Sequence, residues 1–253
     1  MFRKWITAMS RRSSVEFALL SDVGRARAHN EDACAAEEAQ GLFVICDGMG
    51  GAAGGEVASH LASRIFLEEA LPQSGDESPA WRLNHAVVKA NHVVYQAAIA
   101  DPLLRGMGTT LVALQVDESN GKVWTANVGD SRCYRLRDQE LHLLTKDHSY
   151  VDEQVRLGVL TPEEALLSPL RNIITRAVGS HEEVQPDVVA HEACAGDLYL
   201  LCSDGLTREL NDEEIADLLI ACGHDLHSFA ESLVHMANES GGSDNISVIL
   251  VRV

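Results

Sequence analysis

The stretch Leu42-Phe-Val-Ile-Cys-Asp-Gly-Met-Gly-Gly51 joins an apolar run to an acidic, glycine-rich turn. The apolar run ends abruptly at Asp47, which is typical of a short buried strand. An Asp-Gly pair is favoured turn chemistry, so a lone pair of this kind usually serves only a turn. The glycines here also let the backbone bend sharply and bring a carbonyl close to a ligand. The stretch therefore predicts a buried strand whose end carries a candidate functional carboxylate.

Further acidic residues stand in equivalent places. Asp130, Asp204 and Asp244 each lie next to a strand-like run, and Glu31 and Asp32 follow the first such run. Since strand ends can converge at one edge of a sheet, carboxylates that are distant in the sequence can meet there. Carboxylates that gather raise one another's pKa unless a cation compensates their charge. Because oxygen ligands without Cys or His favour hard divalent ions, we expect Mg²⁺ or Mn²⁺ at this site.

One cationic residue accompanies this acidic set. Arg27 precedes Glu31 by four residues. Its planar guanidinium group matches the oxygens of a phosphate bidentately. Taken alone, Arg27 would as readily form a surface salt bridge. Beside a carboxylate and metal cluster, phosphate binding becomes the favoured interpretation.

Strand-like and helix-like segments occur in groups along the chain. Apolar, β-rich runs predict strands at 15–20, 42–46, 109–116, 122–128, 133–136, 141–144, 198–202 and 246–253. Apolar residues at helical spacing predict helices at 56–71, 81–100, 212–222 and 227–238. This grouping argues against strictly alternating βαβ winding. It favours an α+β fold in which helices pack on antiparallel sheets.

The predicted domain organisation is simple. Residues 149–177 depart from the strand framework, because they combine mixed charges and short helical pieces with Pro162 and Pro169. We predict that this segment is a flap. Residues 1–13 predict a flexible basic lead-in. Because no internal repeat or low-complexity tract interrupts the rest, residues 14–253 are predicted to form one catalytic domain.

Composition excludes several classes of protein. The 253 residues include 20 Lys and Arg against 38 Asp and Glu, a net charge of −18, which disfavours binding to nucleic acid. No apolar run approaches the roughly 18 residues of a transmembrane segment, and no signal-peptide core is evident at the start. The 6 cysteines are scattered without a CxxC pair, so we expect reduced, mostly buried thiols. These features predict a cytoplasmic protein.

Short motifs in a fixed order carry a family resemblance. They are Arg27-Ala-His-Asn-Glu-Asp32, Asp47-Gly-Met-Gly-Gly51, Gly108-Thr-Thr110, Gly129-Asp-Ser-Arg132, Ser203-Asp-Gly205 and Ser243-Asp-Asn245. Each motif is weak alone, but the ordered set is specific and covers nearly the whole chain. The chain resembles the metal-dependent protein phosphatases (PPM family, type 2C serine/threonine phosphatases), in particular their bacterial branch. The resemblance implies a four-layer α-β-β-α sandwich, with two central antiparallel sheets flanked by paired helices and a flap beside the active site.

The resemblance also implies a set of metal ligands. Asp47 matches the aspartate that bridges two metal ions, and the backbone carbonyl of Gly48 matches a ligand of one of them. Asp204 and Asp244 match the other aspartates on the first metal. Asp130 matches an aspartate that helps to hold a weaker third ion, together with the Asp204 position. The implied cofactors are therefore two Mn²⁺ or Mg²⁺ ions, with a third that binds more weakly.

Other residues of the implied site act on water and on phosphate. Glu31 and Asp32 match acidic residues that act mostly on metal-bound water, and Arg27 matches the phosphate-binding arginine. The chain departs from many eukaryotic members at Met49, where those members carry a histidine proposed as a general acid. Methionine cannot donate a proton, so the identity of the acid stays open. His148 is predicted to have a structural role.

The implied reaction is hydrolysis of phosphoserine and phosphothreonine in proteins, with a metal-bridging hydroxide attacking phosphorus in line. Its substrates would be phosphorylated proteins, and a serine/threonine kinase would act on the same targets in the opposite direction. The enzyme is expected to be a monomer. The alternative is a pseudophosphatase or phosphoprotein-binding regulator, which the retention of every metal-ligand aspartate disfavours.

Overall fold

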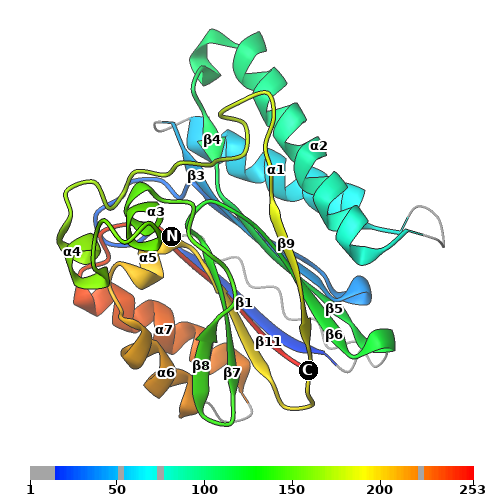
Figure 1. Cartoon of the computed structure of the whole chain (residues 1–253), viewed down its shortest axis with the longest axis vertical. Helices are drawn as coiled ribbons and strands as arrows, with labels where there is room; N and C mark the ends of the chain where they lie inside the picture. The colour runs from blue at the N-terminus through cyan, green and yellow to red at the C-terminus, as the bar shows by residue number, and fades with distance from the viewer. Residues whose placement is uncertain (1–14, 51–53, 73–76, 222–224) are drawn as a thin grey trace.

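The computed structural model describes residues 15–50, 54–72, 77–221 and 225–253. In this part of the chain, two antiparallel sheets pack against each other and helices cover their outer faces (Figure 1). The predicted α+β sandwich with four α-β-β-α layers is therefore confirmed. The predicted basic lead-in, residues 1–13, lies outside the described residues.

The two sheets collect strands from across the sequence. The first sheet has the order β1 (Glu16–Asp22), β11 (Ile246–Arg252), β10 (Leu198–Cys202), β7 (Arg132–Arg137) and β8 (Glu140–Leu143). The second has the order β2 (Asp32–Glu37), β3 (Leu42–Met49), β5 (Leu111–Asp117), β6 (Lys122–Val128) and β9 (Asp187–Glu192), with β4 (Gly108–Thr109) paired to the end of β3. Each sheet therefore joins strands from both halves of the chain.

The longer helices form one pair on each sheet (Figure 1). The second sheet is covered by α1 (Gly54–Ala70) and α2 (Pro79–Ala100). The first sheet is covered by α6 (Asp212–Ile220) and α7 (Leu226–Ser240), and the short α5 (Asp204–Thr207) directly follows β10. The start of α6 is fixed by a capping box, in which the side chain of Asn211 accepts from the backbone of Glu214 and the Glu214 side chain accepts in return.

Three apolar layers hold the sandwich together. One lies between the α1–α2 pair and the second sheet, one between the α6–α7 pair and the first sheet, and one between the sheets. Strand β11 contributes to two of them, because Ile249 and Val251 face the other sheet while Val248 and Leu250 face the helices. Strand β11 is therefore covered on both faces, which explains why its apolar residues run almost without interruption.

The sequence patterns missed two strands. Strand β2 reads Asp-Ala-Cys-Ala-Ala-Glu and contains no β-branched residue, so its β-propensity is low. Strand β9 lies at the edge of its sheet and is largely open to solvent, so the apolar alternation of a half-buried strand is weak there. Both strands exist because neighbouring strands pair with them.

Residues 149–177 run along the open end of the sandwich. They contain α3 (Tyr150–Arg156) and α4 (Pro162–Leu167), whose N-caps are the side chains of Ser149 and Thr161. The backbone N–H of Tyr150 donates to the carbonyl of Ile173 at 2.8 Å, so the end of the segment folds back onto its start. Several of its large apolar side chains are exposed, most strongly Leu166 and Leu167.

Two further expectations concern the described residues as a whole. None of their helices combines the length and the apolar character that crossing a bilayer requires. Cys34, Cys46, Cys133, Cys194 and Cys202 are free thiols, and Cys222 lies outside the described residues. The expectation of burial is correct for Cys46, Cys133 and Cys202, whereas Cys194 is exposed because it lies in the loop after β9.

Candidate active site

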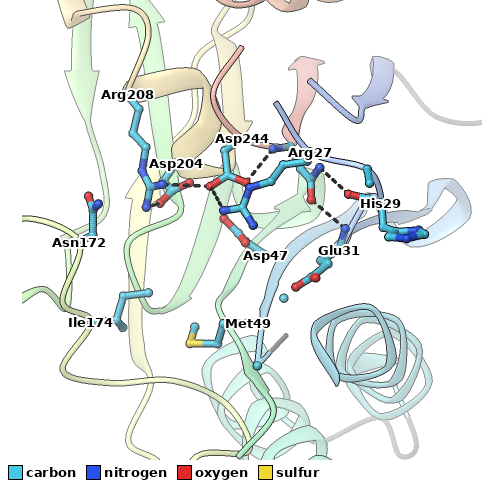
Figure 2. A pocket seen from close by; sticks show the side chains of 14 residues that line it. Arg27, His29, Glu31, Asp47, Met49, Asn172, Ile174, Asp204, Arg208 and Asp244 are labelled. Atoms are coloured by element: carbon cyan, nitrogen blue, oxygen red, sulfur yellow. Dashed lines mark hydrogen bonds and ion pairs between the residues drawn. The ribbon is translucent and has the colours of Figure 1, made fainter. Parts of the chain in front are cut away.

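A pocket of about 630 Å³ opens where strand ends from both sheets meet (Figure 2). Its lining includes six of the residues predicted from the sequence: Arg27, Glu31, Asp47, Gly48, Asp204 and Asp244. The other lining residues are Ala28, His29, Met49, Gly50, Asn172, Ile174, Arg208 and Asn245. The fold thus brings together side chains that are separated by more than two hundred positions.

The end of β3 places Asp47 in the pocket. Its backbone N–H donates to Thr110 Oγ1 at 3.0 Å, and its carbonyl accepts from the Thr110 N–H at 2.9 Å and from Thr109 Oγ1 at 2.8 Å. Gly48 follows at a crowded point of the chain, since a Cβ there would lie 2.1 Å from the carbonyl oxygen of Gly55. The Asp-Gly pair quoted from the sequence is therefore required by close backbone packing, and not only by a turn.

Asn245 fastens the loop that carries Arg27 and Glu31. Its side-chain amide donates to the carbonyls of Val23 and His29 at 2.9 Å each, and its oxygen accepts from the Glu31 N–H at 2.8 Å. Since Asn245 directly precedes β11, this loop is held against the first sheet. The carboxylate of Glu31 lies against Gly55, where an added Cβ would come within 2.0 Å of Glu31 Oε2.

Two carboxylates and two guanidinium groups meet on one side of the pocket (Figure 2). Arg27 Nη2 lies 2.8 Å and Arg208 Nη1 2.9 Å from the same oxygen, Oδ2 of Asp244. Arg208 also pairs with Asp204, four residues earlier on the turn of α5. Burial acts to lower the pKa of Arg208, but the charges of Asp204 and Asp244 outweigh it and raise that pKa overall. The guanidinium group is therefore a permanent cation within the cluster.

Asp32 and Asp130 are buried and do not line the pocket, but they lie close enough to Asp47 for their charges to act on it. Burial, with the charges of Asp204 and Asp244, raises the pKa of Asp32 to about 7, although Ser203 Oγ donates to its carboxylate at 2.8 Å. Burial and the charge of Asp204 likewise raise the pKa of Asp130 to about 7. One oxygen of each carboxylate has no hydrogen-bond partner among the described residues. These two side chains are thus available to a cation.

The two main pocket aspartates experience the same environment. Burial raises the pKa of Asp47 well above its ordinary value, and the charges of Asp32 and Asp204 raise it further. Burial also raises the pKa of Asp204, while Arg208 acts in the opposite direction. A cation among these carboxylates would remove the repulsion and restore their ionised forms.

A buried histidine positions the backbone next to Asp130. Gly129 donates its N–H to His148 Nδ1 at 3.1 Å, and its carbonyl accepts from the His148 N–H at 2.9 Å. Burial, together with the charge of Arg176, lowers the pKa of His148, so the ring is favoured in its neutral form. These contacts agree with the structural role predicted for His148.

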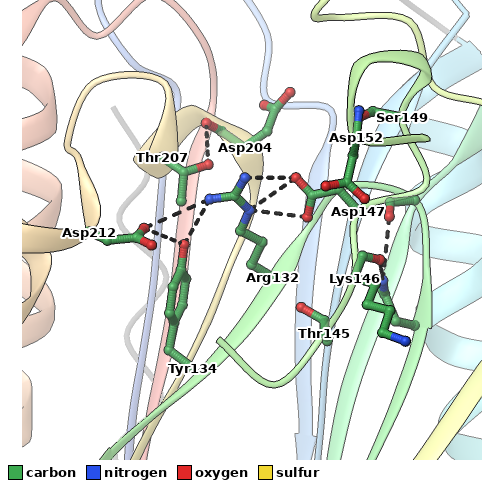
Figure 3. Close-up of polar contacts among 12 residues, drawn as sticks. Arg132, Tyr134, Thr145, Lys146, Asp147, Ser149, Asp152, Asp204, Thr207 and Asp212 are labelled. Carbon is green, nitrogen blue, oxygen red and sulfur yellow. Dashed lines mark hydrogen bonds and ion pairs between the residues drawn. The ribbon is translucent and has the colours of Figure 1, made fainter. Parts of the chain in front are cut away.

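The Gly129–Arg132 motif ends in a second polar network (Figure 3). Arg132 Nε and Nη2 donate to the carboxylate of Asp147 at 3.1 and 2.7 Å, and Nη1 donates to the hydroxyl of Tyr134 at 2.9 Å. Tyr134 donates in turn to Asp212 Oδ1 at 2.9 Å. The network connects β7 to the loop before residues 149–177 and to the start of α6, so the arginine of this motif serves the scaffold.

The donor chemistry of the cluster fits Mg²⁺ or Mn²⁺. All of the groups are oxygen ligands, several are buried and mutually repelling, and Asp32 and Asp130 have unpartnered oxygens. Among the described residues, no three His, Cys, Asp or Glu side chains stand in the arrangement of a completed metal cage. Arg208 lies between two of the carboxylates that would have to converge.

Sequence reasoning missed several residues of the pocket. The clearest is Arg208, whose only signal was its position four residues after Asp204, the spacing of one helical turn. Asn172 and Ile174 come from the predicted flap, and no motif marked them. Asn245 belonged to a quoted motif, but its role in fastening the loop depends on tertiary contacts.

A profile of the protein phosphatase 2C family matches residues 24–250. The chain belongs to this family. The family assignment made from the ordered motifs is thereby confirmed. The matched region begins before Arg27 and ends inside β11, so it contains every residue of the pocket.

Bacterial members of the protein phosphatase 2C family are close relatives of the chain. Serine/threonine protein phosphatase PstP of Mycobacterium tuberculosis (strain ATCC 25618 / H37Rv) is 40% identical over 243 residues, which cover 94% of this chain and 45% of PstP. The chain thus spans about half the length of that relative. Protein phosphatase PhpP of Streptococcus pneumoniae is 37% identical over 245 residues, covering 94% of this chain and 98% of PhpP.

A solved structure in the family contains metal. The catalytic domain of PstP in complex with two manganese ions matches this structure with a TM-score of 0.84 and 38% identity. The match covers 94% of this chain and 97% of that domain. The fold described above is therefore that of a protein phosphatase 2C domain.

Proposed function

We propose that this chain is a metal-dependent protein phosphatase that hydrolyses phosphoserine and phosphothreonine in proteins. The observation that carries the proposal is the convergence of Glu31, Asp47, Asp204 and Asp244 with Arg27 on one solvent-accessible pocket. The relative named serine/threonine protein phosphatase PstP supports the same activity. A non-catalytic, phosphoprotein-binding role is disfavoured, because the acidic cluster is complete.

The metal ligands would come from the ends of four strands, β3, β6, β10 and β11. We assign Asp47, Asp204, Asp244 and the backbone carbonyl of Gly48 to two Mn²⁺ or Mg²⁺ ions, and Asp130 with Asp204 to a weaker third. When bound, such ions supply Lewis acidity and lower the pKa of water enough to provide a nucleophile near neutral pH. The manganese ions in the PstP structure support this assignment.

The residues of the chain bind and orient the phosphate and control protons. Arg27 is half exposed at the pocket, so its guanidinium group can reach the phosphate oxygens of a substrate. Glu31 and Asp32 lie beside the ligands, where they would hold or accept protons of water. Met49 lines the pocket but cannot donate a proton, so protonation of the leaving alkoxide has to come from water or from an acidic side chain.

The organisation around this activity is also proposed. Residues 14–253 would form one catalytic domain, preceded by a flexible lead-in at 1–13, and residues 149–177 would act as a flap, because Asn172 and Ile174 line the pocket. We further propose a monomer in the cytoplasm that acts on phosphorylated proteins and opposes a serine/threonine kinase.

The test is hydrolysis of phosphoserine and phosphothreonine peptides with Mn²⁺, with Mg²⁺ and with a chelator. We expect hydrolysis only with metal, and Asp47→Asn should abolish it while the protein stays folded. Asp138→Asn is the matched control, because Asp138 is exposed in the β7–β8 turn. Tight binding of phosphopeptides without hydrolysis by the wild-type protein would instead establish the non-catalytic alternative.

A further inference from the structure

Arg208 is a second guanidinium group in the pocket, and no sequence motif assigned it a role. It follows α5 directly, and its backbone N–H donates to the carbonyl of Asp204 at 2.8 Å, which fixes the start of its side chain. About a third of the side chain is exposed, and Arg208 is one of the residues that line the pocket. Arg208 is therefore both anchored and accessible.

Arg208 and Arg27 converge from different elements. Arg27 reaches the pocket from the loop after β1, whereas Arg208 reaches it from the end of α5. Both donate to the same oxygen of Asp244, at 2.8 and 2.9 Å (Figure 2). Two guanidinium groups that share one carboxylate oxygen are close enough to share the oxygens of one phosphate group, since phosphate and carboxylate offer the same acceptor chemistry.

The pocket has more negative than positive side chains, so a second arginine would help it to bind an anion. Among the described residues, the lining has four carboxylates, Glu31, Asp47, Asp204 and Asp244, against the guanidinium groups of Arg27 and Arg208. A phosphate monoester enters as a dianion, and the chain as a whole has a net charge of −18. A single arginine would compensate only part of the repulsion between the phosphate and the carboxylates. Two arginines can contact different oxygens of the same phosphate group.

We propose that Arg208 is a second substrate-binding residue, which forms with Arg27 a two-arginine clamp for the phosphate dianion of the substrate. This inference rests on the proposed phosphatase function and deepens it. The clamp favours a phosphate monoester dianion over a phosphodiester monoanion, because a monoester has the additional charged oxygen that the second guanidinium group can bind. Residues Asn172 and Ile174 complete the pocket, so the phosphorylated residue would enter between the clamp and the predicted flap.

The experiment compares wild type with Arg208→Gln, Arg208→Lys and the control Arg64→Gln. Arg64 is an exposed residue of α1 that pairs only with Glu68 in the described contacts, so its substitution changes the net charge equally but away from the pocket. Binding of inorganic phosphate is measured by calorimetry at saturating Mg²⁺, after Mg²⁺ affinity has been determined for each variant. Steady-state kinetics with a phosphothreonine peptide and with bis-p-nitrophenyl phosphate are measured under the same conditions.

We expect Arg208→Gln to weaken phosphate binding and to raise KM for the phosphopeptide by about tenfold, as for loss of a charge-assisted hydrogen bond. Arg208→Lys should lose about threefold, because lysine keeps the charge without the planar fork. Activity on the diester should change less than twofold, and Arg64→Gln should match wild type. Thermal unfolding of each variant checks that it is folded, and Arg208→Lys remains informative if Arg208→Gln is not.

The proposal is overturned if phosphate binding by the folded variants equals that of wild type at saturating Mg²⁺. It is equally overturned if only Mg²⁺ affinity changes, since Arg208 would then act solely as a counter-ion of Asp204 and Asp244. Failure of the proposed function looks different, because the wild-type protein would then hydrolyse no phosphoester with metal. Phosphate calorimetry would still show in that case whether Arg208 contacts the anion.

Discussion

Two buried aspartates, Asp197 and Asp130, differ in the hydrogen-bond partners that surround their carboxylates. Asp197 accepts from Arg137 Nε at 2.7 Å and Nη2 at 2.5 Å, from the Cys194 N–H at 2.9 Å and from the Tyr199 hydroxyl at 2.9 Å. Burial acts to raise its pKa, but the hydrogen bonds from Arg137 and the other donors lower it overall. Asp130 has an oxygen without a partner, and its pKa is raised to about 7.

This contrast distinguishes carboxylates with a structural role from carboxylates that are free to bind a ligand. In a buried carboxylate whose oxygens all accept hydrogen bonds, those bonds offset the cost of burying the charge. A buried carboxylate with an unpartnered oxygen lowers stability unless a cation binds it. Burial alone would not distinguish Asp197 from Asp130. The distinction comes from the donors that surround each side chain.

The largest expected effect comes from Asp204→Asn in the acidic cluster. This substitution should lower metal-dependent hydrolysis of p-nitrophenyl phosphate by about 10³-fold or more, equivalent to about 4 kcal/mol of transition-state stabilisation. In a chelator the variant should unfold in urea at the same or a higher concentration than wild type, because one of several repelling charges is gone. Normal activity, or marked destabilisation in the chelator, would show that Asp204 has a structural role like that of Asp197.

Removing Arg137, the partner of Asp197, should lower stability and leave the hydrolysis rate almost unchanged. Arg137→Ala removes the cation of Asp197 but leaves the Cys194 and Tyr199 donors, so it should reduce the free energy of unfolding by about 1.5–3 kcal/mol. The hydrolysis rate per folded molecule should stay within about twofold of wild type, because Arg137 is absent from the pocket lining. Arg64→Ala removes an exposed pair and should cost at most about 1 kcal/mol. Equal urea midpoints for the two variants would contradict the comparison.

The dependence of stability on pH should differ with and without metal. The pKa values of Asp32 and Asp130 rise from 3.8 to about 7 in the folded protein, so the folded state binds more protons than the unfolded chain between those pH values. In a chelator the free energy of unfolding should therefore fall as pH rises from about 4 to 7, by up to about 4 kcal/mol for each of these two carboxyl groups. Saturating Mn²⁺ should reduce this loss, and Asp130→Asn should remove part of it.

Urea denaturation at several pH values measures this effect. Asp197 has a lowered pKa, so its contribution is lost only as pH falls below 3.8 and does not interfere in this window. A stability that rises from pH 4 to 7 in the chelator would show that the cluster is already compensated without metal.

The smallest expected effect concerns long-range charge. Because the chain carries a net charge of −18, an acidic phosphopeptide is repelled during its approach. We expect kcat/KM for such a peptide to rise about two- to threefold when inert salt is raised to roughly 0.2 M. A peptide with basic residues around the phosphorylated position serves as the control and should not show this rise. A steep fall for the acidic peptide would indicate that the local arginines dominate the encounter.

Much of the site could be predicted because its chemistry follows strand ends. Asp47, Asp204 and Asp244 each adjoin an apolar run that is long enough to identify as a strand. Arg208 could not be identified in this way, because a single arginine after a short helical turn has no distinctive pattern. Strand β2 was missed because it is rich in alanine. The pairing of β2 with β3, which sets Asp32 opposite Asp47, was therefore missed as well. Local propensity does not report pairing that a neighbouring strand imposes.

The sequence by itself determined the α+β class, the order of most strands and helices, the family and the acidic residues of the site. It could do so because apolar periodicity, glycine turns and ordered motifs are local properties of the chain. Only the tertiary structure decided which carboxylates are satisfied, as at Asp197, and which are not, as at Asp130. It also decided that Arg208 joins Arg27 at Asp244. Burial and partnering depend on groups brought together from distant parts of the chain, and no local pattern encodes them.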